Sequence, residues 1–271
     1  MNLLIKNTDR LKTSNKTAIL LYSNNILLNI KSYKEIYEIS KKIYQTMEQL
    51  MINTTINCVG LLMDKNVYLP SIIIRKVFQI TSNDNIFWGT PLSFDPSLIE
   101  LMLSLLNGAT LTIVPPSVYI NPSALSKTLF DVAKVTVLQM VPSVFLRWNE
   151  HTIGKILQNS SLRLLALGGE LFPKSLLKFD RDKKLLLFNL YGVTELSCWA
   201  TVHQIDQNTT DDISIGDCLN ETVLKVYDEN LMEISEGIGE IYIVIQENAT
   251  STTNQQTLPY LFSEKLVIWP C

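Results

Sequence analysis

Short apolar runs alternate along this chain with segments whose apolar residues recur at helical spacing. Ser32 followed by Glu35 predicts a capping box at the start of one helix. The runs expected as strands are 17–22, 26–30, 58–63, 86–88, 109–114, 135–138, 164–167 and 185–189, and two of the helices expected between them are 96–106 and 122–132. Strands separated by helices predict the α/β class, with a largely parallel sheet covered on both faces.

The pattern changes near residue 201, where short β segments separated by polar turns begin. Strands are expected at 223–227 and 240–245, and the glycines at 237 and 239 indicate a hairpin turn, because no helix follows them as a phosphate loop would require. We therefore divide the chain into a core, 1–200, a small β-subdomain, 201–247, and a tail, 248–271. In that tail, 250–256 has the composition of a disordered segment, and 260–269 is apolar enough to need burial or a partner.

Composition narrows the classes of function. The chain has 271 residues, 46% of them hydrophobic, and a net charge of −3, which argues against binding a nucleic-acid backbone. Four cysteines without a C-x-x-C pair, and only two histidines, give no zinc-like spacing. No signal-peptide pattern or run of transmembrane length is present, so we expect a cytoplasmic protein with no membrane or nucleic-acid partner.

The run Asn189-Leu-Tyr-Gly-Val-Thr-Glu195, which follows Gly168-Gly169-Glu170, carries the most specific chemistry. A tight turn there would bring together a ring for a base, a hydroxyl for a phosphate and a carboxylate for Mg²⁺. Taken alone, the run could equally be an ordinary junction between a strand and a helix.

With its neighbours, this block resembles the adenylate-forming superfamily, which includes acyl-CoA synthetases, luciferases and the adenylation domains of peptide synthetases. Upstream, Pro91–Ser97 is similar to the Phe-Asp-x-Ser element of that family, and downstream 214–216, 223–228 and 236–241 resemble the stretch that follows its nucleotide site. The resemblance extends from near the N-terminus to about Ile245. The runs 91–97, 135–139, 162–170 and 197–201 are most similar to the animal branch that activates beta-alanine.

The resemblance implies an incomplete N-terminal domain of an adenylate-forming enzyme, with ATP and Mg²⁺ as cofactors. The expected reaction is attack of a carboxylate on the α-phosphorus of ATP, followed by transfer of the acyl group to the phosphopantetheine arm of a carrier domain. Tyr191 would stack on adenine, Thr194 would bond the α-phosphate and Glu195 would hold Mg²⁺. The other nucleotide-binding residues implied by the motifs are Gly168, Gly169, Glu170, Asn189 and Gly192. For Glu195, the alternative is an exposed carboxylate at a helix start.

For the acyl substrate, the resemblance implies that Asp95 pairs with the ammonium of an amino acid. The residues implied around the substrate are Ile99, Leu165, Leu167, Leu190, Cys198 and Trp199. Trp199 would make the pocket short, which suits beta-alanine. Alternatively, all six are core residues, and Asp95 caps the helix 96–106, a role compatible with substrate binding.

Two family elements have no counterpart in this sequence. The Ser/Thr/Gly-rich loop ending in Pro-Lys-Gly, which binds the ATP phosphates, is absent, and we place a deletion near Ile74 and Arg75. The C-terminal domain with its catalytic lysine is also absent. We therefore expect a catalytically impaired fragment of a ligase. The alternatives are a non-catalytic module that binds adenosine or docks a carrier protein, and a gene-model artefact that never folds.

Overall fold

The computed structural model describes residues 13–23, 26–35, 37–38, 74, 76–194, 198–209, 213–219, 222–235, 237–245 and 262–267. Its strands are β1 (Thr17–Ser23), β2 (Ile26–Ser32), β3 (Asn85–Phe87), β4 (Thr110–Ile113), β5 (Val137–Met140), β6 (Leu164–Gly168), β7 (Leu186–Tyr191), β8 (Thr201–Gln204), β9 (Asp217–Cys218), β10 (Thr222–Tyr227), β11 (Ile238–Ile245) and β12 (Phe262–Val267). Its helices are α4 (Pro96–Asn107), α5 (Pro116–Tyr119), α6 (Pro122–Ser126), α7 (Pro142–Phe145) and α8 (Glu150–Asn159), with the π-helix η1 (Lys127–Val132) and the 3₁₀-helix η2 (Lys174–Lys178).

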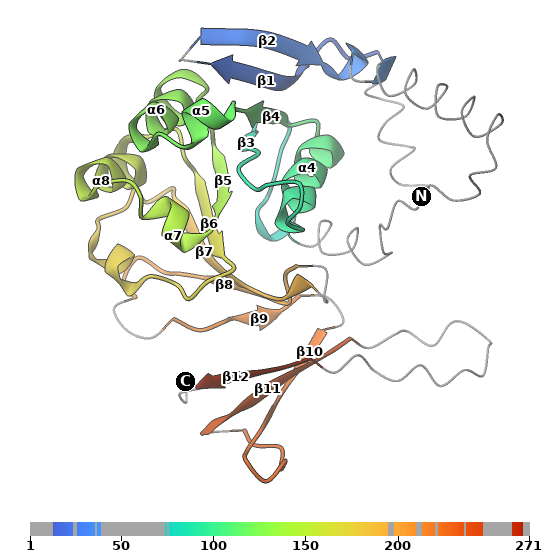
Figure 1. Cartoon of the computed structure of the whole chain (residues 1–271), viewed down its shortest axis with the longest axis vertical. Helices are drawn as coiled ribbons and strands as arrows, with labels where there is room; N and C mark the ends of the chain where they lie inside the picture. Colours follow the sequence, from blue (N-terminus) through green and yellow to red (C-terminus); the bar gives the residue numbers. More distant parts are fainter. Residues whose placement is uncertain are drawn as a thin grey trace, which may run out of the picture.

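In these ranges the strands form a nine-stranded sheet, ordered β2-β1-β4-β3-β5-β6-β7-β8-β9, and a three-stranded sheet, ordered β10-β11-β12 (Figure 1). The large sheet is parallel from β1 through β4, β3, β5 and β6 to β7. Its outer strands β2, β8 and β9 pair antiparallel. The prediction of an α/β fold with a largely parallel sheet is therefore confirmed.

Both faces of the central strands are buried. One hydrophobic cluster joins α4 to the sheet through residues such as Ile99 and Leu103, and a second joins α6, α7 and α8 to the opposite face. Figure 1 shows α4 on one side of the central strands and α5 to α8 on the other. This two-sided burial explains why the strands read as continuous apolar runs rather than as alternating patterns.

The predicted helix boundaries agree with the structure where capping residues mark them. Helix α4 starts at Pro96 and ends before Gly108. Gly108 has a φ of 63°, and its backbone N–H donates to the Ser104 carbonyl, which closes the last turn. The helix expected over 122–132 begins as α6 but continues as the π-helix η1, which a 3.6-residue spacing does not indicate.

At Ser32, the capping box is present. The Glu35 carboxylate accepts hydrogen bonds from the Ser32 backbone N–H (2.8 Å) and hydroxyl (2.9 Å), and Ser32 Oγ accepts from the Glu35 N–H at 3.3 Å. Most of the helix that follows, the strand expected at 58–63 and the Arg75 side of the proposed deletion lie outside the described residues.

Two strands of the small sheet, β10 and β11, match the strands expected at 223–227 and 240–245, whereas its third strand was not predicted. Strand β11 pairs antiparallel with β10 and with β12, and β12 comes from the segment assigned to the tail. Ile241 and Ile243 of β11 pack with Ala200 and Tyr191. The boundary expected at residue 201 falls inside the large sheet, because β8 pairs with β7 and β9 with β8. In the described part of the chain, no helix has the length and apolar character needed to cross a membrane.

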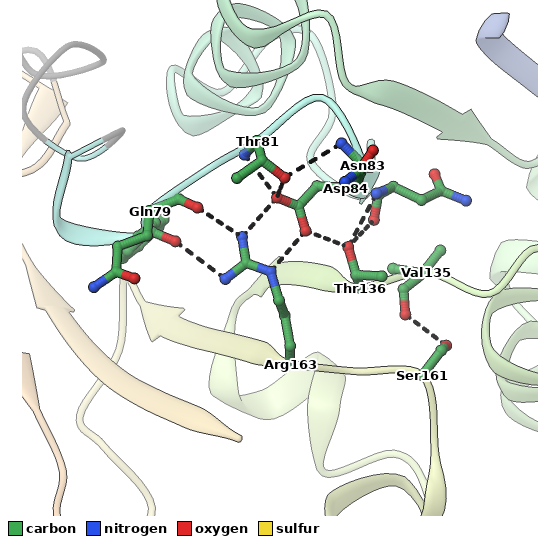
Figure 2. Close-up of polar contacts among 10 residues, drawn as sticks. Gln79, Thr81, Asn83, Asp84, Val135, Thr136, Ser161 and Arg163 are labelled. Carbon is green, nitrogen blue, oxygen red and sulfur yellow. Dashed lines mark hydrogen bonds and ion pairs between the residues drawn. The ribbon is translucent and has the colours of Figure 1, made fainter. Parts of the chain in front are cut away.

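A polar cluster around the buried Asp84 holds together the N-terminal ends of β3, β5 and β6 (Figure 2). Arg163 Nε and Nη2 donate to the two carboxylate oxygens of Asp84 at 2.6 and 2.7 Å, and Thr136 Oγ1 donates to Asp84 at 2.8 Å. The same guanidinium donates to the carbonyls of Phe78 and Gln79 at 3.2 Å. Arg163 therefore ties the segment that precedes β3 to the N-terminal ends of the central strands.

Candidate functional site

The family motifs lie at the C-terminal ends of the parallel strands β3, β5, β6 and β7. In open α/β sheets, ligands bind in the crevice outside these strand ends, since the loops that follow the strands converge there. Gly168 ends β6 and pairs in register with Leu190 of β7, so the Gly168–Glu170 run lies beside the Asn189–Thr194 run.

Gly169 leaves backbone accessible at this edge. Its φ is +84°, and a Cβ atom there would have its nearest neighbours, in Phe94 and Val141, at 3.9 Å. The positive φ, rather than crowding, favours glycine. The carboxylate of Glu170 accepts from the N–H and the hydroxyl of Ser143, both at 2.8 Å, and so caps the first turn of α7. A ligand at this position would therefore meet the backbone of Gly169 rather than the Glu170 side chain.

The second run contributes residues in different environments. Asn189 is buried and donates to the Ser214 carbonyl at 2.9 Å, so its side chain holds the neighbouring loop. Tyr191 is half-buried beside the small sheet, and Thr194 is exposed. Glu195, expected to hold Mg²⁺, lies outside the described residues.

Gly192 is packed too closely to accept any side chain. A Cβ atom there would lie 2.1 Å from the Cys198 carbonyl oxygen and 2.7 Å from the Ala200 nitrogen. Both atoms are backbone, and the Ala200 N–H also bonds the Tyr191 carbonyl at 2.8 Å, so the Ala200 nitrogen cannot move away without breaking that bond. This glycine fixes residues 198–200 against the nucleotide motif.

We expect Gly192→Ala to destabilise the fold markedly, by about 1–3 kcal/mol, because the new methyl group overpacks a site walled by backbone atoms. The matched control is Gly154→Ala, inside α8, where a Cβ atom would lie 3.8 Å from its nearest neighbour, in Phe179. That change should stabilise the chain by about 0.5–1 kcal/mol, because alanine has the higher helix propensity. Thermal unfolding followed by circular dichroism measures both, and a Gly192→Ala chain as stable as wild type would contradict the packing described.

Trp199 lies across the end of β6. A Cβ atom on Gly168 would meet a carbon of the Trp199 ring at 2.5 Å, so the indole occupies the space that a side chain at 168 would need. The indole N–H donates to Gln139 Oε1 at 3.1 Å. Cys198, which precedes it, is buried with a φ of 79°, a conformation that few residues other than glycine adopt.

Gln139 and Glu100, which the sequence did not single out, complete this site. Glu100 has no exposed surface, and its carboxylate accepts from the N–H groups of Gly89 (3.1 Å) and Thr90 (3.2 Å), the Thr90 hydroxyl (2.6 Å) and Gln139 Nε2 (3.3 Å). Burial raises the pKa of Glu100 to about 8 despite these bonds. The sequence carried a signal for Glu100: the helical spacing of 96–106 places position 100 on the side of the helix that faces the sheet. A carboxyl group at a buried helix position is unusual and could have been identified as a candidate site residue.

The residues expected around the substrate do not all lie together. Ile99, Leu190, Cys198 and Trp199 share the cluster on the α4 face. Leu165 and Leu167 pack in the cluster on the opposite face, because successive residues of a strand alternate.

The residues of β6 that share the α4 face with Trp199 include Ala166, in the same cluster, and Gly168, against which the indole lies. Because successive strand residues alternate between faces, the sequence positions 166 and 168 could have been assigned to one face together. For Leu165 and Leu167, the geometry favours the alternative that they are core residues.

Asp95 occupies the N-cap position of α4, but its side chain makes no capping hydrogen bond. Burial chiefly, and then the charges of Asp95 and Glu100, raise the pKa of the Cys198 thiol well above its usual value. Asp95 therefore contributes negative charge at the start of α4, next to Phe94, whose ring lies near Gly169.

The chain is similar to known proteins in sequence. The family model described as AMP-binding enzyme matches residues 63–249. The beta-alanine-activating enzymes of Mus musculus and Homo sapiens are each 38% identical to the chain, over 204 and 197 residues, which cover 70% and 68% of this chain and 18% of each relative. The chain thus spans about a fifth of the length of the curated relatives that it matches.

Solved structures share the fold, among them an adenylation domain. The Vibrio cholerae adenylation domain AlmE, in complex with glycyl-adenosine-5'-phosphate, has a TM-score of 0.57 and 24% identity, covering 66% of this chain and 35% of that one. CmiS6 has a TM-score of 0.53 and 27% identity, covering 65% of this chain and 44% of that one. The chain belongs to the AMP-binding enzyme family, whose members are adenylate-forming ligases.

Proposed function

We propose that the sheet edge formed by Gly168–Glu170, Tyr191–Thr194 and Asp95 binds the adenylate of a small amino acid, with beta-alanine the favoured acyl group. The observation that carries this proposal is the convergence of three motifs, far apart in the sequence, at one edge of a parallel sheet. Beta-alanine is favoured because the curated relatives at 38% identity are named for activating it.

Each residue has a defined task in this proposal. Tyr191 would stack on adenine, the backbone of Gly168 and Gly169 would line the base, and Thr194 would bond the α-phosphate. Asp95 would pair with the substrate ammonium, because a half-buried carboxylate favours a cation beside it. Glu195 would hold Mg²⁺. ATP would supply the phosphorus that the substrate carboxylate attacks, and these residues act by positioning and neutralising charge.

We further propose that turnover by this chain is weak. The sequence holds no Gly-x-x-x-x-Gly-Lys segment or comparable loop to donate backbone N–H groups to the β- and γ-phosphates. A site of this kind would hold an adenylate better than it would hold ATP. Transfer of the acyl group to a phosphopantetheine carrier would follow only where adenylation occurs.

ATP–pyrophosphate exchange, with a panel of amino and fatty acids, tests the proposed activity. We expect exchange stimulated by beta-alanine and other small amino acids, at a rate only slightly above that of a Glu195→Ala variant. Circular dichroism of both proteins ensures that folded chains are compared. Exchange stimulated only by fatty acids would contradict the assigned substrate class, and vigorous exchange would contradict the proposed impairment.

The missing phosphate loop also favours a second candidate function, a non-catalytic module that binds adenosine or docks a carrier protein. Such a module would bind adenylate analogues or a carrier without any exchange. The exchange assay therefore separates the two candidates, because the module shows none above the Glu195→Ala background.

A further inference from the structure

A continuous chain of hydrogen bonds links the interior of the protein to the Trp199 indole. It runs from Thr90 to Glu100 (2.6 Å), from Gln139 Nε2 to Glu100 Oε1 (3.3 Å) and from Trp199 Nε1 to Gln139 Oε1 (3.1 Å). Glu100, Gln139 and Trp199 are all at least 96% buried. Water therefore offers these groups little alternative, and each depends on its protein neighbours for hydrogen bonds.

The direction of these bonds is fixed by chemistry. An indole N–H can only donate, so the Gln139 carbonyl oxygen must face Trp199. The Gln139 NH₂ group must then face acceptors, and it meets two, the Pro96 carbonyl at 3.2 Å and Glu100. Glu100 in turn is held by Gly89, Thr90 and Gln139, all of which donate. Reversing the Gln139 amide would place a donor against the Trp199 donor.

The indole held in this way sets how far the site extends. Its ring lies against Gly168, in the cluster that also holds Leu190 and Ile99, and Asp95 lies one helical turn before Ile99 at the start of α4. A substrate whose ammonium pairs with Asp95 would run toward this ring. Displacing the indole is therefore the structural change that would lengthen the space available to the acyl group.

We propose that Glu100 is a positioning residue which, through Gln139, fixes the Trp199 indole across Gly168 and so restricts the site to short amino acids. This inference rests on the proposed function of the same site. It assigns the size limit to a buried carboxyl group that does not touch the substrate.

The variant Glu100→Gln breaks the chain with a minimal change of shape. The new amide must turn its oxygen toward the N–H groups of Gly89 and Thr90, so its NH₂ group faces the NH₂ group of Gln139. Two donors then meet where the distance is 3.3 Å in the wild type. Either the Gln139 amide turns over and opposes the indole N–H, or it withdraws; both outcomes release Trp199.

Adding Gln139→Glu should repair the chain. In the double variant Glu100→Gln/Gln139→Glu, the carboxylate at 139 accepts from the new amide with one oxygen and from the Trp199 indole with the other. The carboxyl and amide groups have exchanged places, so the composition of the pair is unchanged. Only the Pro96 carbonyl loses its donor.

The experiment measures binding of beta-alanyl-, leucyl- and phenylalanyl-sulfamoyl-adenosine by calorimetry at pH 9, where Glu100, whose pKa burial raises to about 8, is the carboxylate that accepts these bonds. The wild type should bind the beta-alanyl analogue more tightly than the other two. In Glu100→Gln, the ratio of the phenylalanyl to the beta-alanyl dissociation constant should fall by about tenfold or more, the discrimination that one or two methylene groups of pocket size confer. The double variant should return the ratio toward the wild-type value.

A second measurement follows the indole directly. The chain has four tryptophans, so 5-fluorotryptophan labelling gives few ¹⁹F resonances, and a Trp199→Phe variant assigns the one from Trp199. Glu100→Gln should shift or broaden this resonance, and the double variant should restore it. Asp84→Asn is the control, because it weakens the cluster at the N-terminal ends of the central strands, away from the site. It should alter neither the Trp199 resonance nor the affinity ratio.

The possible outcomes are distinct. If the folded wild type binds none of the analogues, the proposed function fails, and the size limit fails with it. If it binds them but Glu100→Gln leaves both the ratio and the Trp199 resonance unchanged, the positioning role alone is overturned. The same holds if Glu100→Gln alters them and the double variant does not restore them, because loss of packing would then be the cause.

Discussion

Replacing Arg163 by methionine is expected to destabilise the fold more than replacing its partner, Asp84, by asparagine. Arg163→Met should cost about 3–5 kcal/mol, the usual effect of leaving one member of a buried ion pair uncompensated. The Asp84 side chain is 4% exposed and would keep only hydroxyl and backbone donors, from Thr81 and Thr136. The carbonyls of Phe78 and Gln79 would lose their guanidinium donors as well.

Asp84→Asn should cost less, about 1–3 kcal/mol, since it removes charge-assisted bonds but strands no buried charge. Arg163 is 30% exposed in this pair, so water can reach it, and it keeps its two carbonyl partners. Urea unfolding compares the two variants with Lys155→Met, whose ion pair with Asp131 is about half exposed and should contribute about 0–1 kcal/mol. Equal costs for Asp84→Asn and Arg163→Met would contradict this asymmetry.

Acid should weaken the same cluster. Burial alone would raise the pKa of Asp84, but the hydrogen bonds from Arg163, Thr81 and Thr136 outweigh burial and hold the pKa below its usual value of 3.8. The stabilisation is therefore fully present above pH 3.8 and is lost as the pH falls through the lower pKa of the folded state. Asp84→Asn should remove this part of the acid sensitivity.

Glu100 should give the opposite dependence, with stability falling as the pH rises. Its pKa is raised from 4.5 to about 8 by burial. A raised pKa in the folded state means that the proton stabilises the fold: the contribution is complete below pH 4.5 and is lost as the pH rises toward about 8. Across that window the free energy of unfolding should fall by up to about 1.4 kcal/mol per pH unit.

Urea unfolding at several pH values tests this in the wild type and in Glu100→Gln. The variant should be less stable at acidic pH but should lose most of the slope, because the new amide does not titrate. The groups that interact electrostatically with this region are the Cys198 thiol, the Asp95 carboxylate and Tyr119, and none of them is altered by the substitution. A slope that persists in Glu100→Gln would show that another group titrates between pH 4.5 and 8, because the raised pKa values of Cys198 and Tyr119 lie above that window.

How much the sequence predicted depended on whether the signal was local. The limits of α4 are local, because Pro96 and Gly108 mark its ends, and the capping box at Ser32 is equally self-contained. The parallel sheet follows from the rhythm of apolar runs. The pairing of β12 with β11 is not local, and the polar segment between them gives no indication of it.

The candidate site shows the same division. Motifs located Gly168, Tyr191 and Asp95 along the chain, but the face on which Leu165 and Leu167 lie is decided by the pleat of β6 and the helices that cover it. The Glu100–Gln139–Trp199 chain joins residues that are 39 and 60 positions apart, and no spacing rule connects one of them to the next. Only the folded sheet brings them together.

The measurement that tests the central claim most directly is calorimetric binding of beta-alanyl-sulfamoyl-adenosine, AMP and ATP to the folded chain. A retained adenylate site without a phosphate loop predicts that the analogue binds more tightly than AMP, since it also reaches Asp95 and Trp199. It also predicts that ATP binds no more tightly than AMP, because the two additional phosphates find no donors. A folded chain that binds no analogue, or that binds ATP far more tightly than AMP, would contradict the account.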